Sequence, residues 1–414
     1  MTEFNLADRP WIPARMLDDS LAELSLNDTI LRAREILWIE GDSPLGTAAI
    51  HRFLLAILHR ALSGPRTVEE GCEWLRNGFP RMAIQTYLDK WHGRFNLFDS
   101  ERPFFQVSGL EKQEHASPKH WTLIQPEAGS NNTSSLFNHE RREGYVPEPA
   151  TPSEAVVALL TYQCFALQGT IWVFRRSAKS APTATAAHTI IMGENLHETL
   201  CLNLVPYLDP DHDIPIWERE DVLSVAYMNT KPSERAAGFV QAYTWPSRSV
   251  LLSPEIRDGS VMVPAVYVGA GVHLEESESY RTDPFVAYRY DKKGNLQAVR
   301  FRSDRGFWRD FASIMPSSSA RDGIEPRVAS HARSLYRAIG VRGRPLKVLV
   351  VGQVSDRAKI QLWRSEMYEF PPAFYSDRDL YGTVRVALEE AEDGGKRISS
   401  AVFTLAGELL SERR

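Results

Sequence analysis

Apolar side chains recur every three or four residues between positions 47 and 62, and Gly64-Pro65 follows this run. The spacing predicts one long helix that ends before the Gly-Pro pair. One or two further helices are predicted between residues 67 and 90. Another is predicted over residues 153–167, with Ser153 as its N-cap. The first hundred residues are therefore expected to be mainly helical.

Strand patterns stand at the N-terminus and in the second half of the chain. Residues 4–15 suit a short strand pair, because apolar residues and prolines surround a tryptophan. Between about residues 222 and 314, β-branched and aromatic runs alternate with turn signals. Residues 346–352 and 357–363 predict two more strands. We expect these segments to form sheet.

Helical spacing returns after Pro371-Pro372, which marks a boundary in the chain. Apolar residues share one helical face over 380–391 and again over 398–409. Two helices, or one helix broken at Gly394-Gly395, are therefore predicted to end the chain. The pattern divides the protein into residues 1–371 and a helical segment of residues 372–414.

Composition indicates a globular protein of the reducing cytoplasm. The 414 residues are 43% hydrophobic, so the chain can bury a large core. Cys72, Cys164 and Cys201 have no CxxC spacing, which argues against a disulfide framework or a zinc site. No apolar run approaches the roughly 18 residues that span a bilayer, and the N-terminus does not resemble a secretion signal. We expect a cytoplasmic protein that has no membrane partner.

Positive charge is concentrated late in a chain whose net charge is −5. Nine cations against Asp356 alone give residues 327–364 a local charge of +8. Such a segment suits phosphate binding, although a solvated helix and turn would explain it equally well. The nine are Arg327, Arg333, Arg337, Arg342, Arg344, Lys347, Arg357, Lys359 and Arg364.

A second basic stretch, Arg175, Arg176 and Lys179, stands among small residues in a predicted loop. Small neighbours would let the backbone approach a phosphate or a groove. An ordinary exposed loop is the alternative interpretation.

Catalytic and metal motifs are missing from the sequence. The segment 209–213 resembles part of a calcium-binding loop, but Ile214 stands at the sixth position, where such a loop needs glycine. No HExxH, GxSxG, P-loop or HD-type metal motif occurs. We predict no catalytic residues, no bound metal and no cofactor.

Five segments in order give the chain a resemblance to a known family. They are FNLADRPWIP at 4–13, ERPFFQV at 101–107, SSLFNH at 134–139, GENLHETLCLNL at 193–204 and GQVSDRAKIQLWR at 352–364. Each is short, but together they resemble the large subunit of the type I-E CRISPR Cascade complex, the CasA family. The resemblance covers most of the chain up to about Pro371.

The resemblance implies a large mixed α+β domain over residues 1–371, followed by a C-terminal four-helix bundle. Only about forty residues follow Pro372, so we expect a bundle that is truncated or incompletely represented. The implied protein is not an enzyme. It recognises a protospacer-adjacent motif in double-stranded DNA, aids R-loop initiation and recruits the helicase-nuclease in antiviral defence. Its implied partners are the other Cascade subunits, the guide RNA, the target duplex and that helicase-nuclease.

Site residues follow from the matched segments. Residues 177–182 match a loop that is rich in glycine in the family and reads the motif, but they contain no glycine. Arg357, or nearby Gln353, stands where family members present a wedge into the duplex. The implied DNA-binding residues are Arg175, Arg176, Lys179, Ser180, Gln353, Arg357 and Lys359. The implied docking loop for the guide-RNA end of the complex is Leu136, Phe137, Asn138 and His139.

The mechanism requires that these cations and the segment 327–347 converge on one face of the folded protein. Two other classes of function stay open: a nucleic-acid-processing enzyme, and a structural interaction protein whose basic face binds an acidic partner.

Overall fold

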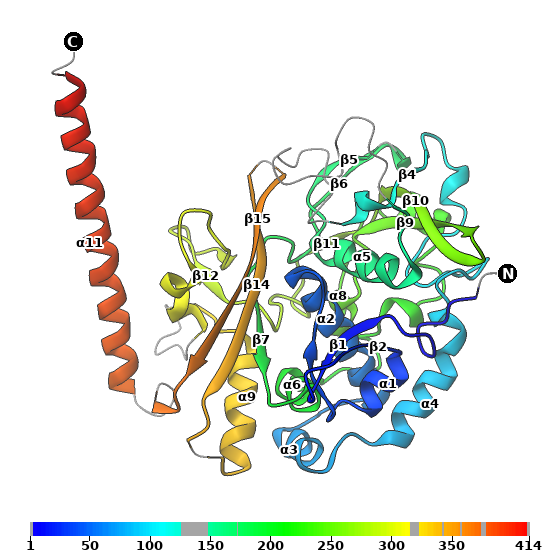
Figure 1. Ribbon diagram of the computed structural model, residues 1–414, viewed down its shortest axis with the longest axis horizontal. Helices are drawn as coiled ribbons and strands as arrows, with labels where there is room; N and C mark the ends of the chain where they lie inside the picture. Colours follow the sequence, from blue (N-terminus) through cyan, green and yellow to red (C-terminus); the bar gives the residue numbers. More distant parts are fainter. Residues whose placement is uncertain are drawn as a thin grey trace.

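Helices and open sheets are mixed along the chain, which confirms the predicted α+β class (Figure 1). The computed structural model describes residues 3–125, 148–171, 173–314, 323–341, 343–356, 358–373 and 378–411. None of the described helices combines the length and the apolar character needed to cross a bilayer.

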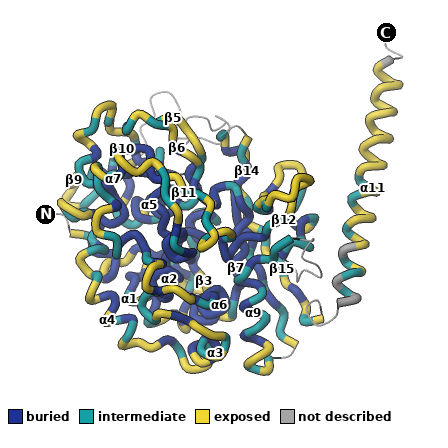
Figure 2. The backbone as a smooth tube through the Cα atoms, turned by 180° about the vertical axis from the view of Figure 1, so that it is seen from behind, coloured by how far each residue is buried: buried dark blue, intermediate teal, exposed yellow. Residues whose placement is uncertain are grey.

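Helix α2 (Pro44–Leu62) lies at the centre of the core and confirms the helix predicted from the apolar spacing. The Ser43 side chain caps it, because Oγ accepts the N–H of Gly46 at 3.0 Å. Every residue from Leu45 to His59 is buried, so α2 has no solvent face (Figure 2). The helices packed against it are α4 (Arg81–Trp91), α5 (Pro152–Phe165), α6 (Leu196–Asn203) and α8 (Phe239–Tyr243).

The N-terminal strand pair is confirmed and gains a third strand. Strands β1 (Ile12–Met16), β2 (Leu21–Leu24) and β3 (Ile36–Ile39) form an antiparallel sheet in the order β2-β1-β3. Trp11 is fully buried beneath it, and its Nε1 donates to the carbonyl of Leu6 at 3.0 Å. The remaining helices of the main body are α1 (Leu26–Leu31), α3 (Val68–Asn77), α7 (Val225–Thr230) and α9 (Arg327–Ala338).

The predicted N-cap of α5 is wrong by two residues. Thr151 Oγ1 accepts the N–H of Glu154 at 3.2 Å, and the Glu154 carboxylate accepts the N–H of Thr151 at 2.7 Å. This reciprocal capping box satisfies two backbone donors, whereas Ser153 could satisfy at most one.

Two long hairpins supply most of the sheet. Strands β9 (Arg248–Arg257) and β10 (Ser260–Ala270) pair with each other and with β4 (Lys119–His120). Strands β14 (Leu346–Asp356) and β15 (Lys359–Phe370) pair with each other, and β7 (His188–Met192) joins β14. Three two-stranded sheets complete the set: β5 (Gly169–Ile171) with β6 (Arg176–Ala178), β8 (Ser233–Arg235) with β11 (His273–Glu275), and β12 (Tyr288–Tyr290) with β13 (Leu296–Ala298).

The C-terminal segment is helical, as predicted, but the break at Gly394-Gly395 is not present. One continuous helix, α11 (Arg378–Ser411), extends along one side of the body (Figure 1). Glu392 attaches it to the segment before the short helix η7 (Phe307–Ile314) through an ion pair with Arg305 at 3.0 Å. Its exposed apolar side chains are Val386, Ile398, Val402, Phe403, Leu405, Leu409 and Leu410.

Candidate nucleic-acid interface

A cleft with a volume of about 910 Å³ separates the loop after β6 from the sheets around it. One wall is residues 179–183. The opposite walls are the start of β11, the turn between β12 and β13, and Ser355 with Ala358 at the tip of the β14–β15 hairpin. The structure therefore brings the two DNA-binding segments predicted from the sequence to one cleft, although they are about 175 residues apart in the chain.

Buried Arg248, at the start of β9, fixes the loop after β6 through hydrogen bonds to backbone carbonyls. Its Nη1 donates to the carbonyl of Lys179 at 2.7 Å and to that of Ser247 at 2.6 Å. Its Nη2 donates to the carbonyl of Leu167. Burial lowers the pKa of this guanidinium, and no carboxylate accepts its hydrogen bonds, because all three acceptors are neutral backbone carbonyls. Sequence analysis missed this residue, because nothing in a strand pattern marks one arginine as buried.

The outer side of the same loop has its own anchors. Ser180 Oγ accepts the N–H of Gln168 at 3.0 Å, and the N–H of Ala181 donates to Ala166 at 2.8 Å. Ser180 is half-buried and lines the cleft. Its hydroxyl therefore fixes the loop, while its exposed side faces the cleft.

The turn between β5 and β6, which precedes the loop, is made without glycine. Phe174 and Arg175 adopt left-handed backbone conformations, with φ of 66° and 48°. These two residues turn the chain between β5 and β6, so the positive φ that glycine would favour lies before residues 177–182 rather than within them.

The three cations of the second basic stretch have different environments. Arg175 is exposed but forms an ion pair with Glu114 at 2.5 Å. Arg176 is half-buried, its Nη2 donates to the carbonyl of Gly271 at 3.0 Å, and burial lowers its pKa. Lys179 is exposed, lines the cleft, and has no side-chain partner among the described residues. Lys179 is therefore the member of the three whose charge is available to a ligand.

Gln353 does not fit a surface role. Its side chain is buried, and Nε2 donates to the carbonyls of Phe165 at 2.6 Å and Ala184 at 2.8 Å. An amide that is enclosed in this way cannot reach a duplex. Gln353 instead connects β14 to the end of α5 and to the segment that follows the loop through these hydrogen bonds. The predicted DNA contact by Gln353 is therefore wrong, and its role is structural.

The tip of the β14–β15 hairpin is a tight turn between Asp356 and Lys359, with Ala358 at φ 62°. Lys359 is exposed beside Ala358 and has no side-chain partner among the residues that the structure describes. Arg357 lies outside the described residues. Lys179 thus lines the cleft, and Lys359 stands next to Ala358, which lines it; neither side chain has a partner among the described residues.

Two arginines at the cleft were missed from the sequence. Arg281 and Arg300 are exposed, line the cleft, and form no ion pair within the described part of the chain. Two acidic residues also line the cleft: Glu275 accepts a hydrogen bond from Ser233 at 2.5 Å and lies 3.6 Å from Arg235, and Glu276 is exposed. Arg281 stands among the acidic residues Glu275, Glu276, Glu278 and Asp283 in the sequence, so its neighbours do not mark it as part of a basic surface.

The segment 327–347 does not converge on this cleft, which corrects the predicted common face. In the strand register, Lys347 lies opposite Glu369 at one end of the hairpin, and Asp356 lies opposite Lys359 at the other end. About 30 Å of strand therefore separates Lys347 from the hairpin tip. Helix α9 lies at the end away from β5 and β6 (Figure 1).

Four of the seven described cations of the basic segment also form ion pairs. The partner carboxylates lie outside residues 327–364, some directly beside its ends and some far earlier in the chain, so a count of charge along the segment does not include them. The pairs are Arg333 with Glu325, Arg344 with Glu198 and Glu194, Lys347 with Glu194, and Arg364 with Glu366. Arg342 lies outside the described residues.

The docking-loop residues Leu136, Phe137, Asn138 and His139 also lie outside the described residues. The two ends of that gap are close together, because Trp121 Nε1 donates to the carbonyl of Glu148 at 2.8 Å. Ala150 continues from there as a bridge to Val263 of β10.

Asp213 ends the segment that resembles part of a calcium-binding loop, and its side chain is not on the surface. It is buried, and its carboxylate accepts the N–H groups of Val240 at 3.0 Å and Gln241 at 2.7 Å at the start of α8. Burial raises its pKa to about 6. In the described part of the chain, no group of three or more His, Cys, Asp or Glu residues is arranged to hold a metal ion.

Comparison with known proteins decides the family. A family model described as CRISPR-associated protein Cse1 matches residues 5–413. The chain belongs to the Cse1 family. A curated Cse1 relative, CasA/Cse1 from Thermus thermophilus, is 38% identical over 418 residues, which are 100% of this chain and 80% of the relative.

Solved Cse1 structures share the fold. The structure of Thermus thermophilus CasA (Cse1) matches with a TM-score of 0.81 and 37% identity over 95% of this chain and 81% of that chain. A chain of a CRISPR RNA-guided surveillance complex matches with a TM-score of 0.79 and 23% identity over 98% of this chain and 83% of that chain. Cse1 membership agrees with the resemblance found in the five sequence segments.

Proposed function

We propose that this Cse1-family chain is the large subunit of a type I-E Cascade surveillance complex and acts by binding rather than by catalysis. Two observations support this: its family, and its fold in common with a chain of a CRISPR RNA-guided surveillance complex. In such a complex the guide RNA reads the target by base pairing, and the large subunit finds the protospacer-adjacent motif in the duplex.

The main support for duplex binding is the position of Lys179 and Lys359. Both are exposed and uncompensated within the described residues, and they stand on two loops that meet at one cleft. Phosphates attract such charges, and buried anchors below the loop fix where Lys179 stands. Arg281 and Arg300 add positive charge on the facing wall.

The other parts of the proposed function are docking to the rest of the complex, R-loop initiation and recruitment of the helicase-nuclease. Leu136, Phe137, Asn138 and His139 would dock the subunit at the guide-RNA end of the complex. The assembled complex would then start the R-loop and recruit the helicase-nuclease. A nuclease assay with magnesium on the purified chain separates this proposal from an enzyme, which would cut DNA unaided.

The single variants Lys179→Ala and Lys359→Ala and the double variant test whether the cleft binds duplex DNA. At 0.15 M salt, each loss of one phosphate contact is expected to weaken binding of the assembled complex to a motif-bearing duplex by about five- to tenfold. The slope of log K against log salt should fall by about one per lysine. Fluorescence anisotropy across a salt series measures both.

Arg337→Ala is the matched control, since Arg337 is exposed on α9, far from the cleft, and carries the same charge. Equal effects of the control and the cleft variants would reject the cleft. If the purified chain binds no duplex but binds an acidic protein in a salt-dependent way, the interaction-protein alternative is favoured instead.

Arg357→Ala tests the proposed wedge. An arginine that stacks on an opened base and holds a phosphate acts after docking. We therefore expect this variant to slow R-loop opening while initial duplex binding changes less than twofold. Permanganate footprinting of unpaired thymines measures opening, and equal losses of docking and opening would contradict a wedge.

A further inference from the structure

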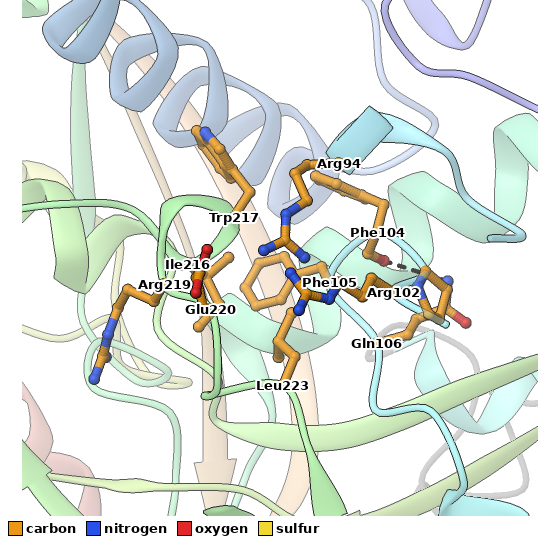
Figure 3. A pocket seen from close by; sticks show the side chains of 11 residues that line it. Arg94, Arg102, Phe104, Phe105, Gln106, Ile216, Trp217, Arg219, Glu220 and Leu223 are labelled. Carbon is orange, nitrogen blue, oxygen red and sulfur yellow. Dashed lines mark hydrogen bonds between the residues drawn. The ribbon is translucent and has the colours of Figure 1, made fainter. Parts of the chain in front are cut away.

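A small pocket on another part of the protein is lined by arginines (Figure 3). Arg94 belongs to the short helix η1 (His92–Phe95), and Arg102 follows in the loop toward Phe105. The opposite wall is the short helix η6 (Ile216–Glu218) and the residues after it, including Glu220. In Figure 3 the side chains of Arg94 and Arg102 both point into the pocket beside Phe105.

Neither guanidinium has a partner among the described residues; Arg94 is half-buried and Arg102 is exposed. Within the described part of the chain, the more enclosed arginines bond to a carboxylate or to backbone carbonyls, as burial of a charge requires, whereas half-buried Arg94 does not. The carboxylate pairs are Arg52 with Asp283, Arg60 with Glu218, Arg219 with Glu234, Arg305 with Asp310, and Arg333 with Glu325. Arg219 also lines the pocket, but Glu234 compensates its charge, whereas Arg94 and Arg102 form no ion pair within the described residues and share the lining with one carboxylate, Glu220.

The two unpaired charges act on each other. Burial lowers the pKa of Arg94, and the charge of Arg102 lowers it further, while Glu220 and Asp99 act in the opposite direction. Asp99 is engaged elsewhere, because its Oδ1 accepts the N–H groups of Glu101 at 2.9 Å and Arg102 at 2.7 Å. An anion placed between the guanidiniums would offset this repulsion, since the two guanidinium charges exceed the single carboxylate charge of Glu220 in the lining.

The pocket wall is rigidly built. The N–H of Phe104 donates to Asn96 at 2.9 Å. The Gln106 side chain donates to the carbonyl of Leu97 at 2.7 Å and accepts the N–H of Leu252 at 2.8 Å. Between them Phe105 holds a left-handed backbone conformation with φ 54°. The wall is thus fixed before any ligand arrives, which lowers the entropy lost on binding.

We propose that the pocket between Arg94 and Arg102 binds a phosphate group. Its volume is about 30 Å³, room for roughly two or three waters, so the anionic group enters while a base or a sugar stays outside. Planar guanidinium groups match phosphate oxygens in geometry and charge. The source is either a backbone phosphate of a nucleic acid or a free phosphate ester. The site is independent of the proposed cleft, with which it shares no lining residue.

Thermal unfolding in inorganic phosphate, at an ionic strength held constant with sodium chloride, tests the site. Phosphate at ten times its Kd is expected to raise the Tm of the wild-type chain by about 2 °C. Arg94→Gln with Arg102→Gln should abolish this increase, and Arg102→Gln alone should weaken phosphate binding by roughly tenfold. Arg337→Gln, which makes the same change on the exposed face of α9, should respond like the wild type.

Phosphate also stabilises proteins by exclusion from their surface, and that effect would be the same in every variant. Equal Tm increases in all four proteins therefore overturn the proposal. The double variant is expected to fold, because removal of two repelling charges should keep its Tm in chloride at or above the wild-type value. If it does not fold, Arg102→Gln alone decides, since Arg102 is exposed.

Competition then identifies the source of the phosphate. A single-stranded oligonucleotide with a 5′-hydroxyl offers internal phosphates only, and adenosine monophosphate offers a terminal one. Displacement of phosphate by the oligonucleotide indicates a backbone site, and displacement by the nucleotide alone indicates a phosphate-ester site. Lys179→Ala should keep either response, so failure of the cleft and failure of this pocket are distinguishable.

Discussion

Replacement of Arg248 by methionine is expected to lower the free energy of unfolding by about 3 kcal/mol and to release the loop after β6. Methionine fills much of the same space but donates no hydrogen bond, so the carbonyls of Leu167, Lys179 and Ser247 lose their donor. Each buried carbonyl left without a partner costs about 1 kcal/mol or more. Urea unfolding measures the change in stability.

The same substitution is expected to weaken duplex binding at least as much as Lys179→Ala does. Lys179→Ala removes one charge from a fixed loop, whereas Arg248→Met leaves the charge and removes its fixed position. Limited proteolysis should show new cleavage within residues 177–187. Arg257→Met is the control, because Arg257 is exposed on the same strand and should change stability by less than about 0.5 kcal/mol. A loop that stays protected in Arg248→Met would show that the guanidinium does not hold it.

The fold was predictable where one periodic pattern determines one element. The apolar spacing of α2 persists over five turns, and the C-terminal segment has the same period, so both were expected to be helical. The break at Gly394-Gly395 was wrongly expected because two glycines weaken a helix without forbidding it. The N-cap of α5 was misplaced because Ser153 and Thr151 are both good capping residues, and only the reciprocal bond to Glu154 selects between them.

The candidate site was predictable only in part. The basic loop composition pointed to Lys179, and the resemblance of residues 352–364 pointed to Lys359, so both exposed cations were proposed from the sequence. Gln353 and Arg248 could not be assigned, because polar residues on strands are buried or exposed according to what packs on them. The charge of residues 327–364 misled for a related reason: its compensating carboxylates, such as Glu194 and Glu198, lie more than a hundred residues earlier.

Buried histidines are expected to make the protein unstable in mild acid. Burial lowers the pKa of His59 and His188 to about 3 and that of His197 and His331 to about 4. The ordinary value is 6.5, so as the pH falls the unfolded chain takes up protons before the folded chain does. Their stabilising contribution is therefore complete above about pH 6.5 and is lost as the pH falls toward 4. Between pH 7 and pH 5.5 each histidine should remove about 1 kcal/mol.

One buried carboxyl opposes this trend. Asp213 has its pKa raised to about 6, so the folded chain holds that proton more tightly than the unfolded chain, and its protonation below pH 6 should restore about 1 kcal/mol. Four histidines outweigh one aspartate, and a net loss of about 3–4 kcal/mol is expected at pH 5.5. Urea unfolding from pH 7.5 to 5 measures it. His331→Gln, which removes one of the four groups, should reduce the net slope by about a third, and an unchanged slope would mean that His331 is protonated equally in both states.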